Sequence, residues 1–207
     1  MKIEHVDFGF PLIIIDDYYE EEELNLIWQE LHFLTKPNVL YKGSDYDSGS
    51  AVDSSGNPLK SNYSAFVDDI YLIREYSNIL TLNRKIFDCW DSITSKNTHW
   101  FFKYFHCTMD FTLFSYYENN DYYDFHRDSA VLTSLTWFYQ EPKKFEGGNL
   151  HFTNGNTIEV LNNRMVLFPS MIPHKVDSIF MEEKNLDKHL GRYCITQFLH
   201  SSSFNNK

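Results

Sequence analysis

Two histidines and one aspartate stand at spacings that could hold a metal ion. His126 and Asp128 are separated by a single residue, and residues two apart on an extended segment project from the same face. His174 follows later in the chain, after a short apolar run, and offers a third ligand. Two imidazoles and one carboxylate on one side of a metal, with the opposite side open, suit non-haem Fe(II) and its reactions with O2. We therefore take His126, Asp128 and His174 as candidate metal ligands.

A His-x-Asp pair is weak evidence by itself, and the chain contains a second one at His5 and Asp7. This second pair is followed by a strand-like apolar run without further candidate ligands, so we interpret it as incidental. The pair at His126 depends on the elements that would position it, and these are considered next.

Length and composition are typical of one globular domain. The chain has 207 residues, of which 43% are hydrophobic and 17% aromatic. The net charge of −11 repels phosphate backbones and argues against nucleic acid as a partner. Cys89, Cys107 and Cys194 form no C-x-x-C pair, which indicates reduced thiols. Because the longest apolar run is too short to span a bilayer and no apolar leader begins the chain, we expect no membrane association and a cytoplasmic location.

The first half of the chain predicts a strand followed by helices. Residues 8–15 are apolar and β-branched, as in a buried strand. Asp16 or Asp17 would then cap a helix whose first turn is a run of glutamates, and apolar residues recur at helical spacing as far as Leu34. Residues 65–95 predict two further helical pieces.

Residues 42–62 are rich in Gly, Ser, Asp and Asn and predict a long loop. Two interpretations remain open: a mobile lid over the metal site, or a disordered insertion. Tyr41, Tyr46 and Tyr63 lie in or beside this segment and would give a closing lid apolar surface to bury.

From His99 onward, short β-type runs alternate with turns, and eight such runs predict a double-stranded β-helix, or jelly roll. Asn154 and Gly155 stand between two of the runs and predict a hairpin. The predicted fold class is therefore α+β, mainly β. A single domain, 1–207, would comprise helical support and a lid (1–98), the jelly-roll catalytic core (99–200) and a frayed tail (201–207). The expected strands of the core are 100–106, 111–117, 131–139, 150–153, 157–160, 164–168, 174–179 and 192–199.

Several motifs surround the candidate ligands in a fixed order. Tyr117 and Tyr123 precede His126, and a Glu-Gly-Gly-Asn-Leu turn at 146–150 follows it. A strand at 163–169 then leads to the second histidine, and Arg-Tyr-Cys-Ile-Thr closes the series at 192–196. In this order, from Thr112 to Phe198, the chain resembles the 2-oxoglutarate- and iron(II)-dependent dioxygenases, and within them the prolyl-hydroxylase-like branch.

That resemblance implies a reaction and a set of roles. Fe(II) held by His126, Asp128 and His174 would use 2-oxoglutarate and O2, with ascorbate as an auxiliary reductant. Decarboxylation of 2-oxoglutarate to succinate would drive hydroxylation of a substrate C–H bond. Arg192 would grip the distal carboxylate of 2-oxoglutarate with its planar fork. The further candidates for the cosubstrate pocket are Tyr117, Tyr123, Thr136 and Thr196.

Some positions depart from the family pattern. Cys194 stands where many relatives have a hydroxyl, and a thiol is the weaker donor. Phe138 stands where others carry a second cosubstrate-binding tyrosine. Tyr117, Ser134 or Thr136 must then complete the pocket, and the sequence leaves that choice open.

A second cation competes for the distal carboxylate. Lys184 lies about where some collagen-type relatives place a lysine. We favour Arg192 because of its Tyr-x-Ile-Thr context, in which Thr196 shares the face of Arg192 on an extended strand.

The substrate implied by the resemblance is a prolyl or other amino-acid residue in a peptide or protein, a free amino acid, or a small molecule. An alternative from another class is a non-catalytic jelly-roll module that binds a metal or ligand without turnover.

Overall fold

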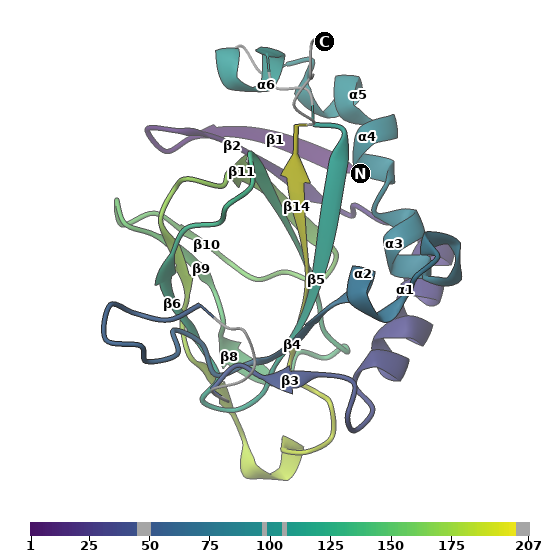
Figure 1. Cartoon of the computed structure of the whole chain (residues 1–207), viewed down its shortest axis with the longest axis vertical. Helices are drawn as coiled ribbons and strands as arrows, with labels where there is room; N and C mark the ends of the chain where they lie inside the picture. The colour runs from purple at the N-terminus through teal and green to yellow at the C-terminus, as the bar shows by residue number, and fades with distance from the viewer. Residues whose placement is uncertain (45–50, 97–98, 105–106, 202–207) are drawn as a thin grey trace.

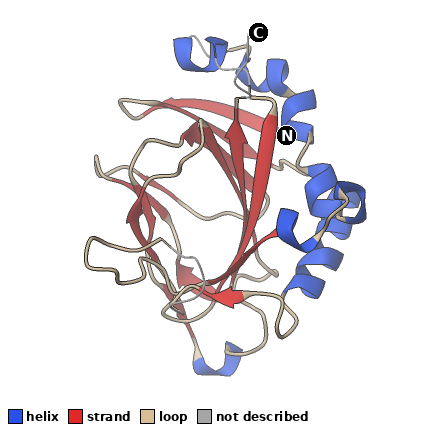
Figure 2. Ribbon diagram, in the orientation of Figure 1, coloured by secondary structure: helices blue, strands red, loops and turns tan. Residues whose placement is uncertain are grey.

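The computed structural model describes residues 1–44, 51–96, 99–104 and 107–201. Antiparallel strands form two facing sheets, and helices cover the outer face of the larger one (Figures 1 and 2). The expected α+β, mainly β, jelly-roll class is confirmed. The larger sheet has the order β1 (Lys2–Asp7), β2 (Pro11–Asp16), β11 (Arg164–Pro169), β7 (Leu132–Phe138), β14 (Arg192–His200), β5 (Met109–Tyr117), β4 (Tyr63–Phe66) and β3 (Tyr41–Lys42).

The smaller sheet carries two of the candidate ligands. Its order is β10 (Thr157–Ile158), β9 (Leu150–Phe152), β12 (His174–Val176) and β6 (Tyr123–His126). A separate pair joins β13 (Ile179–Met181) to β8 (Phe145–Gly147). The helical segments are α1 (Glu21–Leu34), α2 (Val67–Ile70), η2 (Arg74–Tyr76), α3 (Asn78–Leu82), α4 (Lys85–Asp88), α5 (Trp90–Thr94), α6 (Trp100–Tyr104) and η3 (Glu183–Asn185).

Alternation along the strands divides the interior into two apolar clusters. On β14, Tyr193 and Ile195 belong to the cluster beneath the helices, whereas Cys194 belongs to the cluster between the two sheets. Successive side chains of a strand point to opposite faces, so Arg192 and Thr196 point the same way as Cys194. The face that looks into the space between the sheets is therefore the one that carries polar candidates.

Helix α1 begins about one turn later than capping by Asp16 or Asp17 would predict. Its N-cap is Glu20, whose backbone N–H is bound by the Glu23 carboxylate at 2.8 Å. Asp16 instead accepts from Nε of Arg164 at 2.6 Å, so the prediction that Asp16 or Asp17 caps the helix is wrong. The helix ends at Leu34, as predicted.

Residues 100–106 were expected as a strand, and this prediction is wrong for the described part, because Trp100–Tyr104 is helix α6. Phe101 and Phe102 are adjacent in sequence and both buried in the cluster beneath the helices. A strand would send adjacent side chains to opposite faces, whereas a helical turn lets both reach one core.

The remaining strands of the core follow the prediction with local differences. The hairpin at Asn154 and Gly155 is confirmed, because β9 and β10 pair across it. The expected strand 174–179 is split between β12 and β13, which lie in different sheets. The strand predicted over 8–15 corresponds to β2, which forms a hairpin with β1 before α1, and the sequence did not predict β1, β6 or β8.

The segment 42–62 is tied to the smaller sheet in its described part. The backbone N–H of Ser61 donates to Tyr122, and that of Asp124 donates to Leu59. Residues 51–62 therefore have defined hydrogen bonds to the rest of the domain, and both interpretations of the segment, a lid or a disordered insertion, stay predictions. Residues 45–50, including Tyr46, lie outside the described residues, and closure of the segment as a lid stays a prediction.

The three cysteines are free. None of the described helices is long and apolar enough to cross a membrane.

Candidate active site

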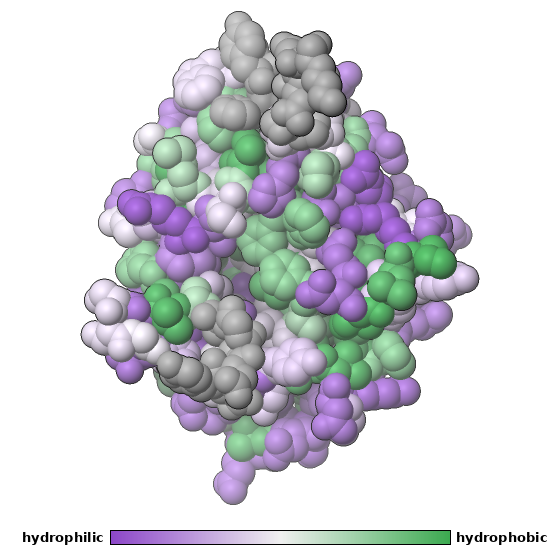
Figure 3. All heavy atoms as spheres, in the orientation of Figure 1, coloured by the Kyte–Doolittle hydropathy of each residue, from purple (hydrophilic) through white to green (hydrophobic). Residues whose placement is uncertain are grey.

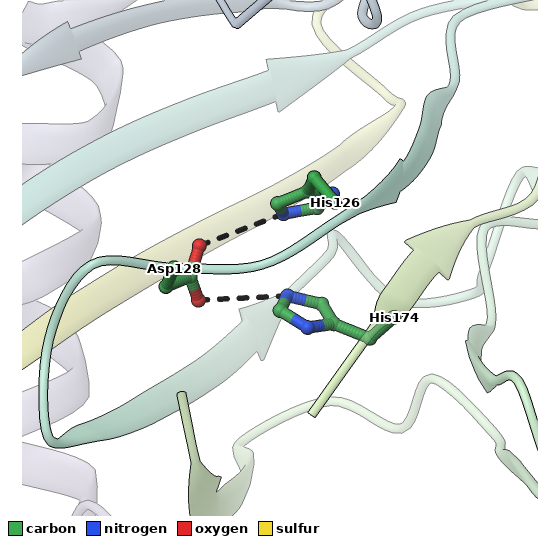
Figure 4. Close-up of side chains that lie close together, drawn as sticks. All are labelled: His126, Asp128 and His174. Carbon is green, nitrogen blue, oxygen red and sulfur yellow. Dashed lines mark ion pairs between the residues drawn. The ribbon is translucent and has the colours of Figure 1, made fainter. Parts of the chain in front are cut away.

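The three candidate ligands meet between the two sheets. Strand β6 ends at His126, and the register of β6 on β12 places His126 directly opposite His174. Asp128 lies just beyond the strand, and its two carboxylate oxygens face the two rings (Figure 4). Nε2 of His126 lies 3.6 Å from Oδ1 of Asp128, and Nε2 of His174 lies 3.5 Å from Oδ2. One ligand atom from each residue lies within 4.8 Å of the others, a spacing suited to one metal ion.

Hydrogen bonds to the backbone set the tautomers of both rings. Nδ1 of His126 lies 2.8 Å from the carbonyl oxygen of Asp124, and Nδ1 of His174 lies 2.9 Å from that of Ile172. A carbonyl oxygen only accepts, so each Nδ1 carries a hydrogen and each Nε2 is the ring atom that faces Asp128. Burial, with a smaller contribution from His174, lowers the pKa of His126 to about 3. The His126 ring is therefore neutral and ready to bind a metal at ordinary pH.

Asp128 is held by groups that the sequence reading did not single out. Thr133 Oγ1 donates to Asp128 Oδ2 at 2.6 Å and lies 2.8 Å from Ser170 Oγ. The backbone N–H of Asp128 donates to the carbonyl of Ser170 at 3.1 Å. Burial raises the pKa of the Asp128 carboxyl, and the neighbouring His174 opposes that shift. A cation at the site would favour the charged carboxylate in the same way.

Tyr123 forms a wall of the site, as its place in the motif suggests. Its ring stacks on that of His126, with centroids 3.5 Å apart and an interplanar angle of 4°. Phe168 packs edge-on against His174 at 4.9 Å. These aromatic contacts restrict the orientations of the two imidazoles.

Arg192 lies at the bottom of a cavity that also contains the three ligands. The side chain is 0% exposed, and all three guanidinium nitrogens lack a hydrogen-bond partner among the described residues. Its charge lies near two aromatic rings, those of Tyr117 at 4.6 Å and Trp137 at 5.6 Å, and near the Cys194 thiol. A buried guanidinium without an acceptor is costly, so the site is built for an anion that supplies one.

The Gly-Gly turn makes room for this arginine. Gly148 has φ +72°, and a Cβ built there would lie 2.9 Å from Cδ of Arg192 and 2.7 Å from Cδ1 of Ile179. A side chain at this position would therefore displace the arginine stem. This contact gives a physical reason for glycine in the motif at 146–150.

The alternation of side chains along the strands determines which polar side chains line the cavity. Cys194 and Thr196 line it with Arg192, as the pattern on β14 predicts, and Tyr117 lines it from the neighbouring strand β5. Whether Tyr117, Cys194 and Thr196 contact a cosubstrate stays a prediction.

Thr136 does not line this cavity, and that prediction is wrong. It pairs with Ile195 across the sheet, and directly opposed residues share a face, so Thr136 points toward the helices. Ser134 is opposite Gln197 and points the same way, as does Phe138 opposite Tyr193.

The two competing residues, Lys184 and His5, lie outside the site. The side chain of Lys184 is 73% exposed and pairs with Glu182, outside the cavity of Arg192. His5 lies in β1 at the far edge of the larger sheet and is not part of the three-residue cluster. The two choices made from the sequence context, Arg192 over Lys184 and His126 over His5, agree with these positions.

Other cavity residues escaped the sequence reading. The two-residue period of a strand could have identified Phe198, which shares the face of Arg192 and Thr196 on β14. Nothing in the sequence points to Lys60, which lies in the loop segment and lines a second, larger cavity of about 1230 Å³ that also includes Tyr123 and Asp128. The remaining residues that line the Arg192 cavity are Leu113, Ser115, Leu135 and Val176.

The donor set fits one divalent iron and one dicarboxylate. Two imidazoles and a carboxylate on one side leave open positions for an oxygen-donor ligand. The unpaired guanidinium of Arg192 lies in the same cavity and matches a carboxylate in charge and shape.

Comparisons with known proteins agree with this geometry. Residues 112–200 match the sequence model of the 2OG-Fe(II) oxygenase superfamily. No curated protein matches the chain.

Solved structures share the fold at low identity. A prolyl-4-hydroxylase from Pseudomonas putida has a TM-score of 0.63 at 12% identity, with 92% of each chain covered. The viral collagen prolyl hydroxylase of Paramecium Bursaria Chlorella virus-1 has a TM-score of 0.53 at 10% identity, over 91% of this chain and 94% of the other. A 2OG-Fe(II) oxygenase family oxidoreductase from Burkholderia pseudomallei has a TM-score of 0.57 at 10% identity, over 91% and 84%.

Proposed function

We propose that the chain is a 2-oxoglutarate-dependent hydroxylase of a C–H bond in an amino-acid substrate, because residues 112–200 match the sequence model of the 2OG-Fe(II) oxygenase superfamily. The substrate would be a prolyl or other residue in a peptide or protein, a free amino acid, or a related small molecule. Two of the similar folds are named prolyl hydroxylases, so prolyl peptides are the natural first probes.

The observation that carries this proposal is the buried, unpaired guanidinium of Arg192 in one cavity with the three-ligand cluster. A metal-binding module without turnover needs the cluster but has no use for a buried cation beside it. A dioxygenase needs both, because its cosubstrate carries a second carboxylate away from the metal.

Each residue has a defined task in this proposal. His126, Asp128 and His174 would hold Fe(II), which supplies the O2 and 2-oxoglutarate chemistry when bound. Arg192 would orient the cosubstrate by its distal carboxylate. Thr133 would hold Asp128 in the orientation that meets the metal. The apolar side chains Leu113, Leu135 and Phe198 would exclude water from the cavity.

The test is formation of succinate from 2-oxoglutarate by the purified chain with Fe(II) and ascorbate. Prolyl peptides and free amino acids are then added, and a gain of one oxygen atom is sought by mass spectrometry. We expect Asp128→Ala to abolish succinate formation and His5→Ala to preserve it. The two substitutions remove residues of comparable His-x-Asp pairs, so activity in Asp128→Ala, or its loss only in His5→Ala, contradicts the proposal.

A further inference from the structure

Lys60 is a buried cation at the entrance to the metal site. Its side chain is 7% exposed and lines the cavity of about 1230 Å³ that meets the site at Tyr123 and Asp128. It does not line the cavity of Arg192. Apolar side chains gather near the centre of the face shown in Figure 3, around β5 and β14 in the view of Figure 1. The two cations therefore belong to two adjoining spaces.

The charge of Lys60 has no anionic partner among the described residues. Nζ donates to Ser64 Oγ at 2.9 Å and lies 5.6 Å from the centroid of the Tyr123 ring. Among the described residues, two of its three N–H groups are left without an acceptor. Lys42, in the same segment, instead pairs with Asp121 at 2.7 Å. Burying an unpaired ammonium costs stability, so its retention points to a ligand that neutralises it.

The position of Lys60 is fixed by its surroundings. The backbone of Lys60 forms an isolated antiparallel β-bridge with Tyr123 of β6, and the backbone hydrogen bonds of Leu59 and Ser61 hold it on both sides. The aliphatic stem runs past Gly43, where an added Cβ would lie 2.7 Å from Cγ of Lys60. The ammonium is thus preorganised rather than free to swing toward solvent.

Lys60 is also close to the metal ligands. Its ammonium lies beside the ring of Tyr123, which in turn stacks on His126. A group bound to Lys60 would therefore place its neighbouring carbon atoms at the mouth of the metal site. Burial lowers the pKa of Lys60 to about 8, so the side chain is still mostly protonated at pH 7.

We propose that Lys60 binds a carboxylate of the primary substrate, and that the substrate is therefore an amino acid or peptide with a carboxylate close to the hydroxylated carbon. This inference rests on the proposed function and names its substrate class. A single ammonium with two free donors matches one carboxylate. A polyphosphate needs several cations, and the net charge of −11 repels it.

The carboxylate could come from two sources, which the experiment separates. One arm uses free L-amino acids against their primary amides. The other uses capped peptides that contain Asp or Glu against the same peptides with Asn or Gln. In each pair the compounds differ in charge and hardly in shape. Substrate-stimulated succinate formation is measured for the parent, for Lys60→Met and for Arg127→Gln, which removes the exposed cation of the same cavity.

We expect one arm to contain an acid that stimulates the parent far better than its amide. In Lys60→Met the KM of that acid should rise roughly ten- to a hundredfold, the value of a charge-assisted hydrogen bond, to approach that of the amide. The KM for 2-oxoglutarate and the uncoupled succinate rate should stay within about twofold of the parent, because Lys60 is outside the cosubstrate cavity. Arg127→Gln should change the KM of the acid by less than about threefold, as for an exposed charge.

Several results would overturn the inference. They are stimulation by amides or neutral peptides only, stimulation by no acid at all, or equal KM changes for acid and amide in Lys60→Met. Absence of any succinate from the parent would instead reject the proposed function, and the inference with it. If Lys60→Met does not fold, Lys60→Gln keeps a polar donor without the charge and makes the same comparison.

Discussion

Substitution of Arg192 by Met tests the cosubstrate pocket most directly. Methionine keeps an unbranched stem in the space beside Gly148 and removes the guanidinium. The parent guanidinium is fully buried, and its three nitrogens lack partners among the described residues, so a carboxylate that reaches it displaces no hydrogen bond to those residues.

The expected loss of 2-oxoglutarate affinity follows from the lack of hydrogen-bond partners around the guanidinium among the described residues. One charge-assisted hydrogen bond contributes about 1.5–3 kcal/mol, or roughly ten- to a hundredfold in affinity. Two parallel bonds from the fork would exceed the upper value. Arg192→Lys keeps the charge but loses the fork, so its affinity for 2-oxoglutarate should lie between those of the parent and Arg192→Met.

The assay is the dissociation constant of 2-oxoglutarate on the metal-loaded protein without O2, supported by the rise in Tm that the ligand causes. A ligand at about 100 times its Kd adds about 2.7 kcal/mol to the free energy of unfolding, and Arg192→Met should lose most of that rise. Without ligand, Arg192→Met should unfold at the same or a higher Tm, because a buried unpaired charge is removed.

Lys184→Ala is the control, since the Lys184 side chain is exposed and pairs with Glu182. We expect it to leave the Kd of 2-oxoglutarate unchanged. Equal losses for Arg192→Met and Lys184→Ala, or a loss only in the latter, would refute the assignment of the distal carboxylate to Arg192.

Three further predictions concern the supports of the site. Thr133→Val, which removes the hydroxyl that binds Asp128, should weaken metal affinity roughly ten- to a hundredfold in a metal-competition titration, and unchanged affinity would contradict the role given to this bond. Gly148→Ala should weaken 2-oxoglutarate binding, because its added Cβ would displace the Arg192 stem. The control is Gly155→Ala, which should lose only stability, because Gly155 has a similar φ of +87° but nothing within 4 Å of its added Cβ. Equal effects of the two substitutions on binding would show that backbone strain alone is responsible. At pH 7, Lys60→Met should be more stable than the parent by up to about 3 kcal/mol in denaturant titrations, which is the free energy that corresponds to the lowered pKa of Lys60. Loss of the hydrogen bond from Lys60 to Ser64 reduces this gain. In the parent, the unfolded state binds more protons than the folded state between pH 8 and the ordinary value of 10.5, so the advantage of Lys60→Met should shrink as the pH rises through that window; a constant difference would mean that the ammonium is not buried as a charge.

The parts of the site that lie on regular strands could be predicted from the sequence. Arg192, Cys194 and Thr196 share a face because a strand has a period of two, and all three line the cavity. The same rule excludes Thr136 once the face of β7 is known, but the sequence of β7 hides that face. Every residue from Leu132 to Phe138 is buried, so hydrophobicity does not distinguish its two sides.

Contacts between distant segments could not be predicted in this way. Thr133 and Ser170 reach Asp128 through the pairing of β7 with β11, which brings together residues far apart in the chain. The aromatic run at Trp100–Tyr104 has the composition of a strand, yet its two buried phenylalanines require a helix. In both cases tertiary packing overrides the local pattern.

Taken together, the two proposed anion sites suggest how the protein would distinguish two carboxylate ligands. Arg192 lies deep between the sheets and offers a planar fork, whereas Lys60 lies in the larger cavity and offers a single ammonium. An acid too bulky to enter the Arg192 cavity can still reach Lys60, and a dicarboxylate small enough to enter gains more from the fork than from the ammonium. On this reasoning, excess 2-oxoglutarate should compete only weakly with the primary substrate. Substrate inhibition by 2-oxoglutarate should therefore appear only far above its KM, and Lys60→Met should raise that threshold further, whereas inhibition close to the KM would mean that the two cations do not discriminate.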